Sequence, residues 1–147
     1  MKKRLHYFGI LILLIALFGC SKETKPINYG KDDCAFCKML VMDNRYGSEI
    51  ITDKGKILIF DSIECLANYI AEKKEPRSAY HSYWVSSYAE PGKLINAEKA
   101  IYLKNDALKS PMGLNVLAVE SDAQLSPITK EFGGEKINFE KIFDLIK

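Results

Sequence analysis

The sequence predicts an α+β domain built from two small ββα-type units that share one core. In the first half, the apolar-rich runs 48–52 and 56–60 flank a short turn at Gly55 and precede a helical pattern. In the second half, strand-like runs precede another helical pattern at the C-terminus. The 128 residues of Cys20–Lys147 suit one compact domain, or two very small ones with a common core.

The chain begins with a pattern typical of a lipoprotein signal peptide. A basic stretch at residues 2–4 precedes an uncharged apolar run at 8–19, which is shorter than the roughly 20 residues that span a bilayer. The run ends Leu-Phe-Gly-Cys, which resembles a lipobox with Cys20 as the acylated residue. We therefore expect a signal peptide at 1–19 and a lipidated tether at 20–29 that holds the protein to a membrane. The alternative is an ordinary signal peptide followed by a free cysteine.

Charge and motifs exclude several classes of function. The full chain carries a net charge of +2, and removal of the signal peptide with its three basic residues lowers this to −1. A near-neutral chain has no basic excess for nucleic acid, so we expect no nucleic-acid partner. The phosphate-binding, HExxH and GxSxG motifs are all missing from the sequence. These observations favour a binding protein over an enzyme.

The first unit is expected at residues 30–76. It begins with a cysteine pair and continues as a β-hairpin, because two strand-like runs are joined by the glycine-containing turn 53–56. Asp61 and Ser62 then offer N-caps to a helix. Apolar residues recur at helical spacing from Ile63 to about Lys73, so we expect the helix to cover this range.

The second unit is expected at residues 77–147. Aromatic and β-branched residues predict a strand at 80–88, and a further strand is expected at 114–120. The segment 96–103 fits either a strand or a short helix. The final segment, 139–147, has the amphipathic pattern of a short helix, with Asn138 before it as a candidate cap.

The cysteines point to a metal or a disulfide. If Cys20 carries lipid, Cys34, Cys37 and Cys65 remain, and an odd number leaves at least one thiol unpaired within the chain. A bound metal would protect such a thiol in an oxidising compartment. The alternative is a Cys34–Cys37 disulfide with Cys65 buried as a small hydrophobe. The cysteine count alone leaves both interpretations open.

The neighbouring methionines favour copper. Thiolates and thioethers are soft donors that prefer Cu(I), and methionine is outside the usual ligand set of zinc. Met39 lies two residues beyond Cys37, so both side chains project from the same face of an extended segment. Met39 and Met42 are three apart in a strand-like run, so one of them can serve in packing, and Met39 is the better ligand candidate. His81 is the one histidine left after cleavage, so a Cys₃His zinc knuckle stays open as an alternative.

Cys65 is expected in the first turn of the helix 63–73. The helix dipole favours a thiolate there. We therefore expect Cys65 to lie near the metal, either as a third thiolate or as a support for the ligands.

The two halves show a loose internal repeat. Met39, a glycine turn, Phe60 and a helix in the first half parallel Met112, a glycine turn, Phe139 and a helix in the second. The alternative is coincidence, because ββα order is common. If the repeat is real, Met39 and Met112 occupy equivalent places and can reach one surface. Met112 lies between a proline and a glycine, in a turn that can present its side chain, so we expect it to be a further ligand.

Taken in order, these motifs resemble the NosL family, encoded beside nitrous oxide reductase. The matching residues are Cys34-x-x-Cys37-x-Met39-x-Val41, Gly55-Lys56, Phe60-Asp61 with Cys65, Trp84-Val85, Asn96-Ala97-x-x-Ala100-x-Tyr102 and Pro111-Met112-Gly113. The likeness covers a domain at about 30–147. The first half also resembles the TRASH metal domains, in which a C-x-x-C knuckle is completed by a later F-x-x-x-x-C.

The resemblance implies a fold, a cargo and a partner. The expected fold has two ββα-type units with a topology similar to organomercurial lyase, the first of them treble-clef-like. The expected activity is Cu(I) binding through sulfur, without catalysis, by a lipid-anchored protein that faces the periplasm. The expected partner is the copper-receiving apoprotein, nitrous oxide reductase in denitrification, or its maturation complex.

One residue departs from the family pattern. Many relatives carry a histidine a few residues after the C-x-M element, where this chain has Asn44. Asparagine is a poor Cu(I) ligand, so the expected ligands are sulfurs: Cys34, Cys37, Met39 and Met112, with Cys65. Two other functions remain as alternatives, a thiol–disulfide oxidoreductase that uses Cys34 and Cys37, and an interaction protein with a structural zinc knuckle.

Overall fold

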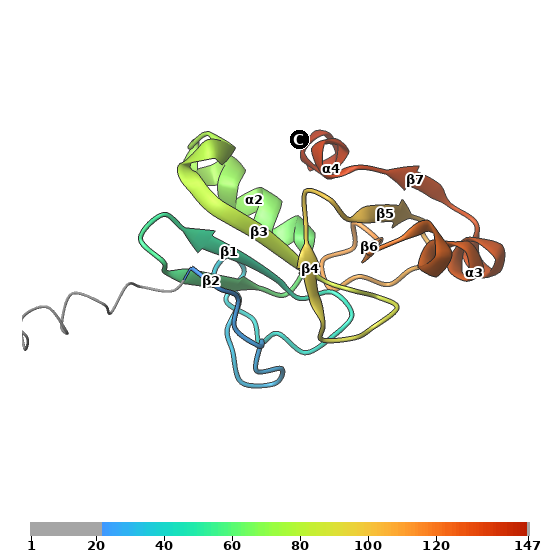
Figure 1. Ribbon diagram of the computed structural model, residues 1–147, viewed down its shortest axis with the longest axis horizontal. Helices are drawn as coiled ribbons and strands as arrows, with labels where there is room; N and C mark the ends of the chain where they lie inside the picture. The colour runs from blue at the N-terminus through green and yellow to red at the C-terminus, as the bar shows by residue number, and fades with distance from the viewer. Residues whose placement is uncertain (1–21, 147) are drawn as a thin grey trace, which may run out of the picture.

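Two antiparallel sheets form the framework of the protein in a computed structural model (Figure 1), of which residues 22–146 are described. The first sheet has the strand order β2-β1-β3-β4 and the second the order β6-β5-β7. The strands are β1 (Ser48–Thr52), β2 (Ile57–Phe60), β3 (Tyr80–Ser86), β4 (Leu94–Asn96), β5 (Ile101–Lys104), β6 (Val116–Val119) and β7 (Glu135–Ile137). The helices are α2 (Ile63–Lys73), α3 (Asp122–Phe132), α4 (Phe139–Leu145) and a 3₁₀ turn η1 (Arg77–Ala79).

Helix α2 begins and ends where the sequence predicts. The side chain of Ser62 caps it by accepting from the backbone N–H of Cys65 at 3.4 Å. Its last residue is Lys73, and the left-handed backbone of the following residue, Lys74 (φ 54°), stops the helix. The predicted hairpin is also confirmed, because β1 and β2 pair antiparallel.

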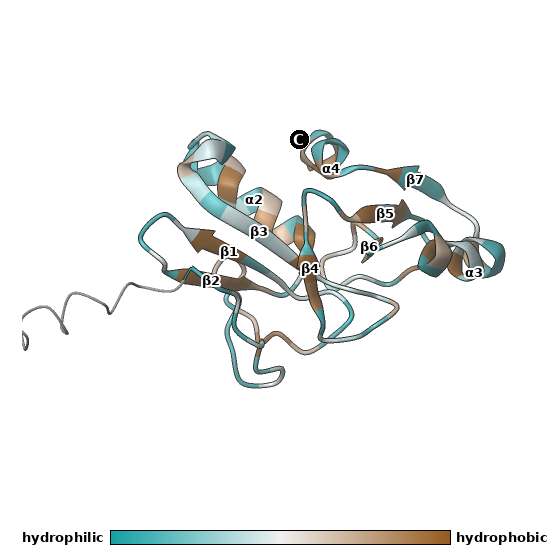
Figure 2. Cartoon of the chain, viewed as in Figure 1, coloured by the Kyte–Doolittle hydropathy of each residue, from teal (hydrophilic) through white to brown (hydrophobic). Residues whose placement is uncertain are grey.

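The two sheets share one core, as expected. The larger apolar cluster joins Ile50 of β1 and Leu66 of α2 to Tyr102 of β5 and Phe139 of α4. A smaller cluster lies under α3, around Leu125. In Figure 2 the strands β1, β2 and β4 are coloured mostly hydrophobic, whereas the connecting loops are mostly hydrophilic. The overall α+β class is therefore confirmed.

Both sheets contain the same ββαβ arrangement. In each, two strands form a hairpin, a helix follows, and the next strand returns antiparallel to the first strand of the hairpin. The order β1-β2-α2-β3 is thus repeated as β5-β6-α3-β7. The predicted boundary after Pro76 lies inside the first sheet, which continues to Asn96.

This arrangement corrects the predicted repeat. The counterpart of α2 is α3, not the C-terminal helix α4. Met39 precedes β1, whereas Met112 lies in the connection between β5 and β6. The two methionines therefore do not occupy equivalent places, and any approach between them comes from tertiary packing.

Three elements differ from the predictions. The ambiguous segment 96–103 is neither one strand nor a helix, because a turn after Asn96 separates β4 from β5. Helix α3 was not predicted, since it contains Pro127 and buries one residue, Leu125. The three-residue strand β7 was also missed. The predicted C-terminal helix is confirmed as α4, capped by Asn138, whose Oδ1 accepts from the backbone N–H of Lys141 at 3.0 Å.

The last residues of the predicted tether belong to the domain. Ile27 is 6% exposed and joins the core, and the hydroxyl oxygens of Tyr29 and Ser86 lie 2.7 Å apart. Gly47 lets this segment approach, because a Cβ there would lie 2.9 Å from both Ile27 Cδ1 and the hydroxyl of Tyr29. The packed domain therefore starts at Ile27 rather than Gly30.

The predicted signal peptide and Cys20 lie outside the described residues. Between residues 22 and 146, none of the helices combines the length and apolar character that crossing a bilayer requires.

Candidate metal centre

Three cysteines and an aspartate converge at the start of α2. The sulfurs of Cys34, Cys37 and Cys65 and a carboxylate oxygen of Asp61 all lie within 4.8 Å of one another. Cys34 and Cys65 are fully buried, Asp61 is nearly so, and Cys37 is partly exposed. We call this group the Cys₃Asp cluster. The structure thus brings together all three cysteines predicted to lie near the metal.

A short knuckle positions the first two sulfurs. Its arms are joined by a bridge between Asp33 and Leu40, and Cys34 N–H donates to the carbonyl of Met39 at 2.8 Å. Lys38 makes the reversal between them, with a left-handed φ of 66°. The knuckle is fixed to the edge of β2 because Ala35 N–H donates to the carbonyl of Ile59 at 2.7 Å.

The corner between β2 and α2 supplies the other two groups. Asp61 occupies this corner, with one carboxylate oxygen 3.7 Å from the sulfur of Cys34 and the other 3.6 Å from the sulfur of Cys37. Ser48 supports the corner, since its hydroxyl donates to the carbonyl of Ser62 at 2.9 Å. The sequence interpretation treated Asp61 as a helix cap and missed its place in the cluster. Its position four residues before Cys65 and directly after the apolar run 57–60 was the available signal.

Contact between the buried thiols of Cys34 and Cys65 shifts their pKa values in opposite directions. The thiol of Cys65 donates to Cys34 and lowers the pKa of Cys34 to about 6. The same contact, together with burial, raises the pKa of Cys65 far above its ordinary value. Burial also raises the pKa of Cys37. In the metal-free protein, burial and the contact with Cys34 therefore oppose the effect that the helix dipole was expected to have on Cys65.

The predicted methionine ligands lie at the surface beside the cluster. Met39 is 50% exposed and Met112 is 43% exposed. Met39, Met42 and Asp61 line one hollow of about 490 Å³, together with Pro111, the neighbour of Met112. Asp61 therefore faces both the cluster and this hollow. A metal ion at the cluster would lie behind a rim of exposed thioethers.

Glu64 holds the loop that carries Met112 against α2. It is almost fully buried, and its carboxylate accepts from the hydroxyl of Ser110 at 3.0 Å and from the backbone N–H of Leu114 at 2.9 Å. Burial raises its pKa. Because Glu64 is adjacent to Cys65, one turn of helix fixes both a cluster sulfur and the Met112 loop. Sequence reasoning missed this role, which depends on a partner 46 residues away.

We compared the chain with models of known protein families. Residues 27–145 match the family model described as NosL.

The chain belongs to the NosL family.

Among solved structures, the crystal structure of the copper chaperone NosL from Shewanella denitrificans is similar to this NosL-family chain. Its TM-score is 0.67 and its sequence identity 17%, over 82% of this chain and 96% of that one. At this identity the likeness establishes the NosL fold. No curated protein matches the chain.

Two residues that the sequence analysis considered in connection with the metal site lie outside the Cys₃Asp cluster of this NosL chain. His81 is exposed on β3 and is not among the clustered groups. The fourth group beside the three cysteines is Asp61, where a Cys₃His knuckle would have a histidine. Asn44, where many relatives carry histidine, is exposed, and its carbonyl accepts from the backbone N–H of Gly92 at 2.8 Å.

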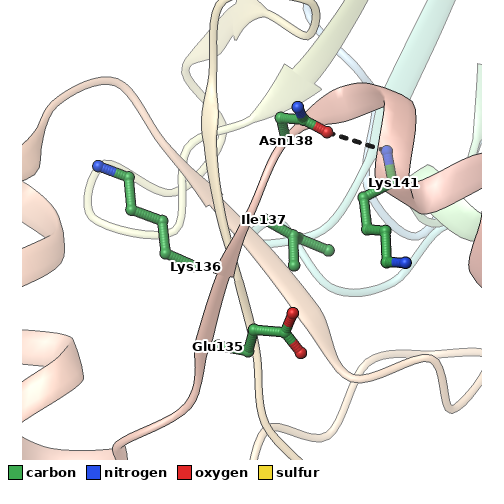
Figure 3. A pocket seen from close by; sticks show the side chains of 5 residues that line it. All are labelled: Glu135, Lys136, Ile137, Asn138 and Lys141. Carbon is green, nitrogen blue, oxygen red and sulfur yellow. Dashed lines mark hydrogen bonds between the residues drawn. The ribbon is translucent and has the colours of Figure 1, made fainter.

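A second hollow of about 490 Å³ lies beside β7 and the start of α4 (Figure 3). Its five lining residues include neither cysteine nor methionine: Glu135, Lys136, Ile137, Asn138 and Lys141. Figure 3 shows the Asn138 side chain engaged in capping α4. This hollow therefore offers no soft donor for copper, in contrast to the hollow lined by Met39 and Met42.

Proposed function

We propose that this NosL-family chain is a membrane-anchored, periplasm-facing metallochaperone that binds Cu(I). It would deliver the ion to an acceptor apoprotein during the assembly of nitrous oxide reductase, and it would act by binding rather than by catalysis. Cys34, Cys37 and Cys65 are the proposed thiolate ligands, and Met39 and Met112 are the proposed sources of a weaker thioether donor beside them.

The observation that carries this proposal is the convergence of three thiols beside exposed thioethers. Three sulfurs within 4.8 Å form a soft site, which favours Cu(I) over hard cations. Cys37 is the least buried of the three cysteines, and Met39 lines the adjoining hollow. These positions support hand-over by ligand exchange, in which an incoming donor replaces one sulfur at a time. The Shewanella denitrificans protein of similar fold is named a copper chaperone, which supports the same cargo.

Anaerobic loading tests the proposal. The protein should bind Cu(I) stoichiometrically, with sulfur-to-copper charge-transfer absorption, and X-ray absorption at the copper edge should count three or four sulfur neighbours. A copper edge dominated by oxygen or nitrogen neighbours would contradict it.

A structural zinc knuckle is the second candidate, because three thiolates and a carboxylate are also zinc donors. Tight zinc binding with unfolding on chelation, and no Cu(I) uptake, would support this function instead. A thiol–disulfide oxidoreductase is less well supported. The low-pKa thiol, Cys34, is fully buried, whereas an attacking thiolate must be accessible.

The proposed anchor has its own test. Cys20→Ser should leave the chain unlipidated and release it from membranes. If the variant still sediments with membranes after a high-salt wash, the lipid anchor is wrong.

A further inference from the structure

The outer edge of β2 is open along part of its length. β2 is an edge strand of the first sheet, and its inner side pairs with β1. Backbone groups alternate in direction along a strand, so those of Ile57 and Ile59 point outward, as the bond from Ala35 to the Ile59 carbonyl shows. Within residues 22–146, this is the one backbone hydrogen bond that reaches the outer edge of β2 from outside the sheet. The N–H and C=O of Ile57 and the N–H of Ile59 are thus available to another strand.

A basic groove of about 390 Å³ adjoins this edge. Phe36 of the knuckle, Leu58 of β2 and Tyr69 of α2 give it an apolar lining. Three exposed lysines surround it: Lys38, Lys56 and Lys73. One acid, Glu72, also lines it, so cations predominate.

The position of the groove relates it to the metal centre. Phe36 and Lys38 flank Cys37 in the sequence, and Cys37 is the partly exposed sulfur of the cluster. The Nζ of Lys38 donates to the carbonyl of Ala35 at 2.6 Å, which holds this lysine across the knuckle. An extended segment placed along β2 would therefore end beside Cys37.

Charge decides which kind of segment fits. A second copy added through the same edge would bring Lys38, Lys56 and Lys73 of the two chains together, and like charges disfavour that pairing. The N-terminal residues 1–21 carry basic residues and no acid, so they are poor occupants too. An acidic, extended segment meets both requirements, because it offers strand hydrogen bonds to Ile57 and negative charge to the lysines.

We propose that the outer edge of β2 and its lysine-lined groove bind an extended acidic segment of the copper-receiving protein. The segment adds a strand to the first sheet and brings the acceptor beside Cys37. The identity of this partner rests on the proposed copper function, whereas strand addition and charge selection rest on the groove itself.

A defined peptide tests the proposal. The probe is a fluorescein-labelled peptide of alternating aspartate and valine, titrated into the full chain in detergent and followed by fluorescence anisotropy. We expect saturable binding, and Lys56→Glu should weaken it about tenfold because a groove charge is reversed. Lys54→Glu is the matched control, since Lys54 is also exposed in the β1–β2 turn but does not line the groove. It should bind the peptide like the wild type.

Amide hydrogen exchange tests the mode of binding. Bound peptide should slow exchange at Ile57 and Ile59, and a peptide N-methylated at alternate residues should lose this protection. Absence of saturable binding, equal losses in Lys54→Glu and Lys56→Glu, or binding without protection of Ile57 would each overturn the proposal.

Copper titration of the same samples separates the two hypotheses. Lys56→Glu should keep the Cu(I) stoichiometry of the wild type. Failure of the wild type to bind Cu(I) would refute the proposed function and the identity of the partner. Failure of peptide binding with Cu(I) uptake intact would overturn the docking site alone.

Discussion

The two ββαβ units share a frame but differ in chemistry. Each has an eleven-residue helix capped by a serine, and each cap accepts from the backbone N–H three residues on, at 3.4 Å. This alignment pairs Cys65 of α2 with Gln124 of α3. It also pairs Asp61 with Glu120, the residue between β6 and the second cap.

The acidic residue between the hairpin and the helix has different surroundings in the two units. Asp61 is buried among three sulfurs, whereas Glu120 is exposed and forms an ion pair with Lys93 at 2.7 Å. The first unit has a knuckle before its hairpin, and the second has the turn after Asn96 in that place. A corner acid therefore becomes part of a cluster only where a knuckle covers it.

The largest effect is expected from a substitution that makes the first unit resemble the second. Cys65→Gln places the residue of the α3 position into α2, and we expect Cu(I) affinity to fall by more than about 100-fold, because a lost ligand costs more than a lost support. Competition with a chromophoric Cu(I) chelator under anaerobic conditions measures this. The reciprocal Gln124→Cys is the control and should create no second site, since no knuckle faces it. Unchanged affinity in Cys65→Gln would reduce Cys65 to a core residue.

The next prediction concerns Glu64, whose counterpart in α3 is Ala123. Glu64→Ala should lower the free energy of unfolding by about 3 kcal/mol, because it leaves buried donors of the Met112 loop unsatisfied. Urea denaturation measures this loss. The Met112 loop should also lose protection from amide exchange at Leu114. A variant as stable as the wild type would show that the loop is held by other contacts.

The two sheets also differ at one buried position of their first strands. When the two hairpins are aligned strand by strand, Glu49 of β1 corresponds to Tyr102 of β5, and both are fully buried. Tyr102 donates to the carbonyl of Ala97 at 2.7 Å, whereas the carboxylate of Glu49 makes no well-formed hydrogen bond and is only approached by the backbone N–H of Lys25. Burial raises the pKa of Glu49 to about 7 from its ordinary value of 4.5.

This difference predicts a pH dependence of stability. Between pH 4.5 and 7 the folded protein holds a proton on Glu49 that the unfolded chain has released, so stability falls as the pH rises through this range. Glu49→Gln removes this titrating group. The free energy of unfolding of the variant, relative to that of the wild type, should therefore be about 2 kcal/mol higher at pH 8 than at pH 5. Urea unfolding at both pH values tests it. A constant difference between the two proteins would contradict the assignment.

The smallest expected effect asks whether the second unit contributes to the site. Met39→Leu and Met112→Leu should each weaken Cu(I) binding about fivefold, with less than about 1.5 kcal/mol of stability at stake because volume is conserved. Met42→Leu is the control and should leave the affinity unchanged, since Met42 follows the knuckle whereas Met39 lies within it and is bonded through its backbone to Cys34. Wild-type affinity and the same sulfur count in Met112→Leu would confine the site to the first unit.

Local patterns in the sequence predicted the first unit well. The hairpin turn, the Ser62 cap and the apolar spacing of α2 are encoded within a few residues of each other, so they could be read directly. Helix α3 has a proline and little buried surface, and it gives no comparable signal.

The cluster could be predicted only in part. The C-x-x-C spacing and the helix-turn position of Cys65 indicated its sulfurs. Asp61 and Glu64 were missed because their roles depend on partners that approach only in the folded chain. The same reason explains Ile27, which looked like part of a polar tether but packs into the core.

The packing of Ile27 would set the reach of the domain above a membrane if the proposed lipid anchor at Cys20 is present. If Cys20 carries the lipid, six residues separate the anchor from the first packed side chain. A chain of that length extends at most about 25 Å, since each residue spans roughly 3.3–3.6 Å. With the proposed anchor, the domain would stay close to the lipid headgroups. An acceptor would then have to present its empty copper site within that distance of the bilayer, and a longer tether would bring more acceptors within reach.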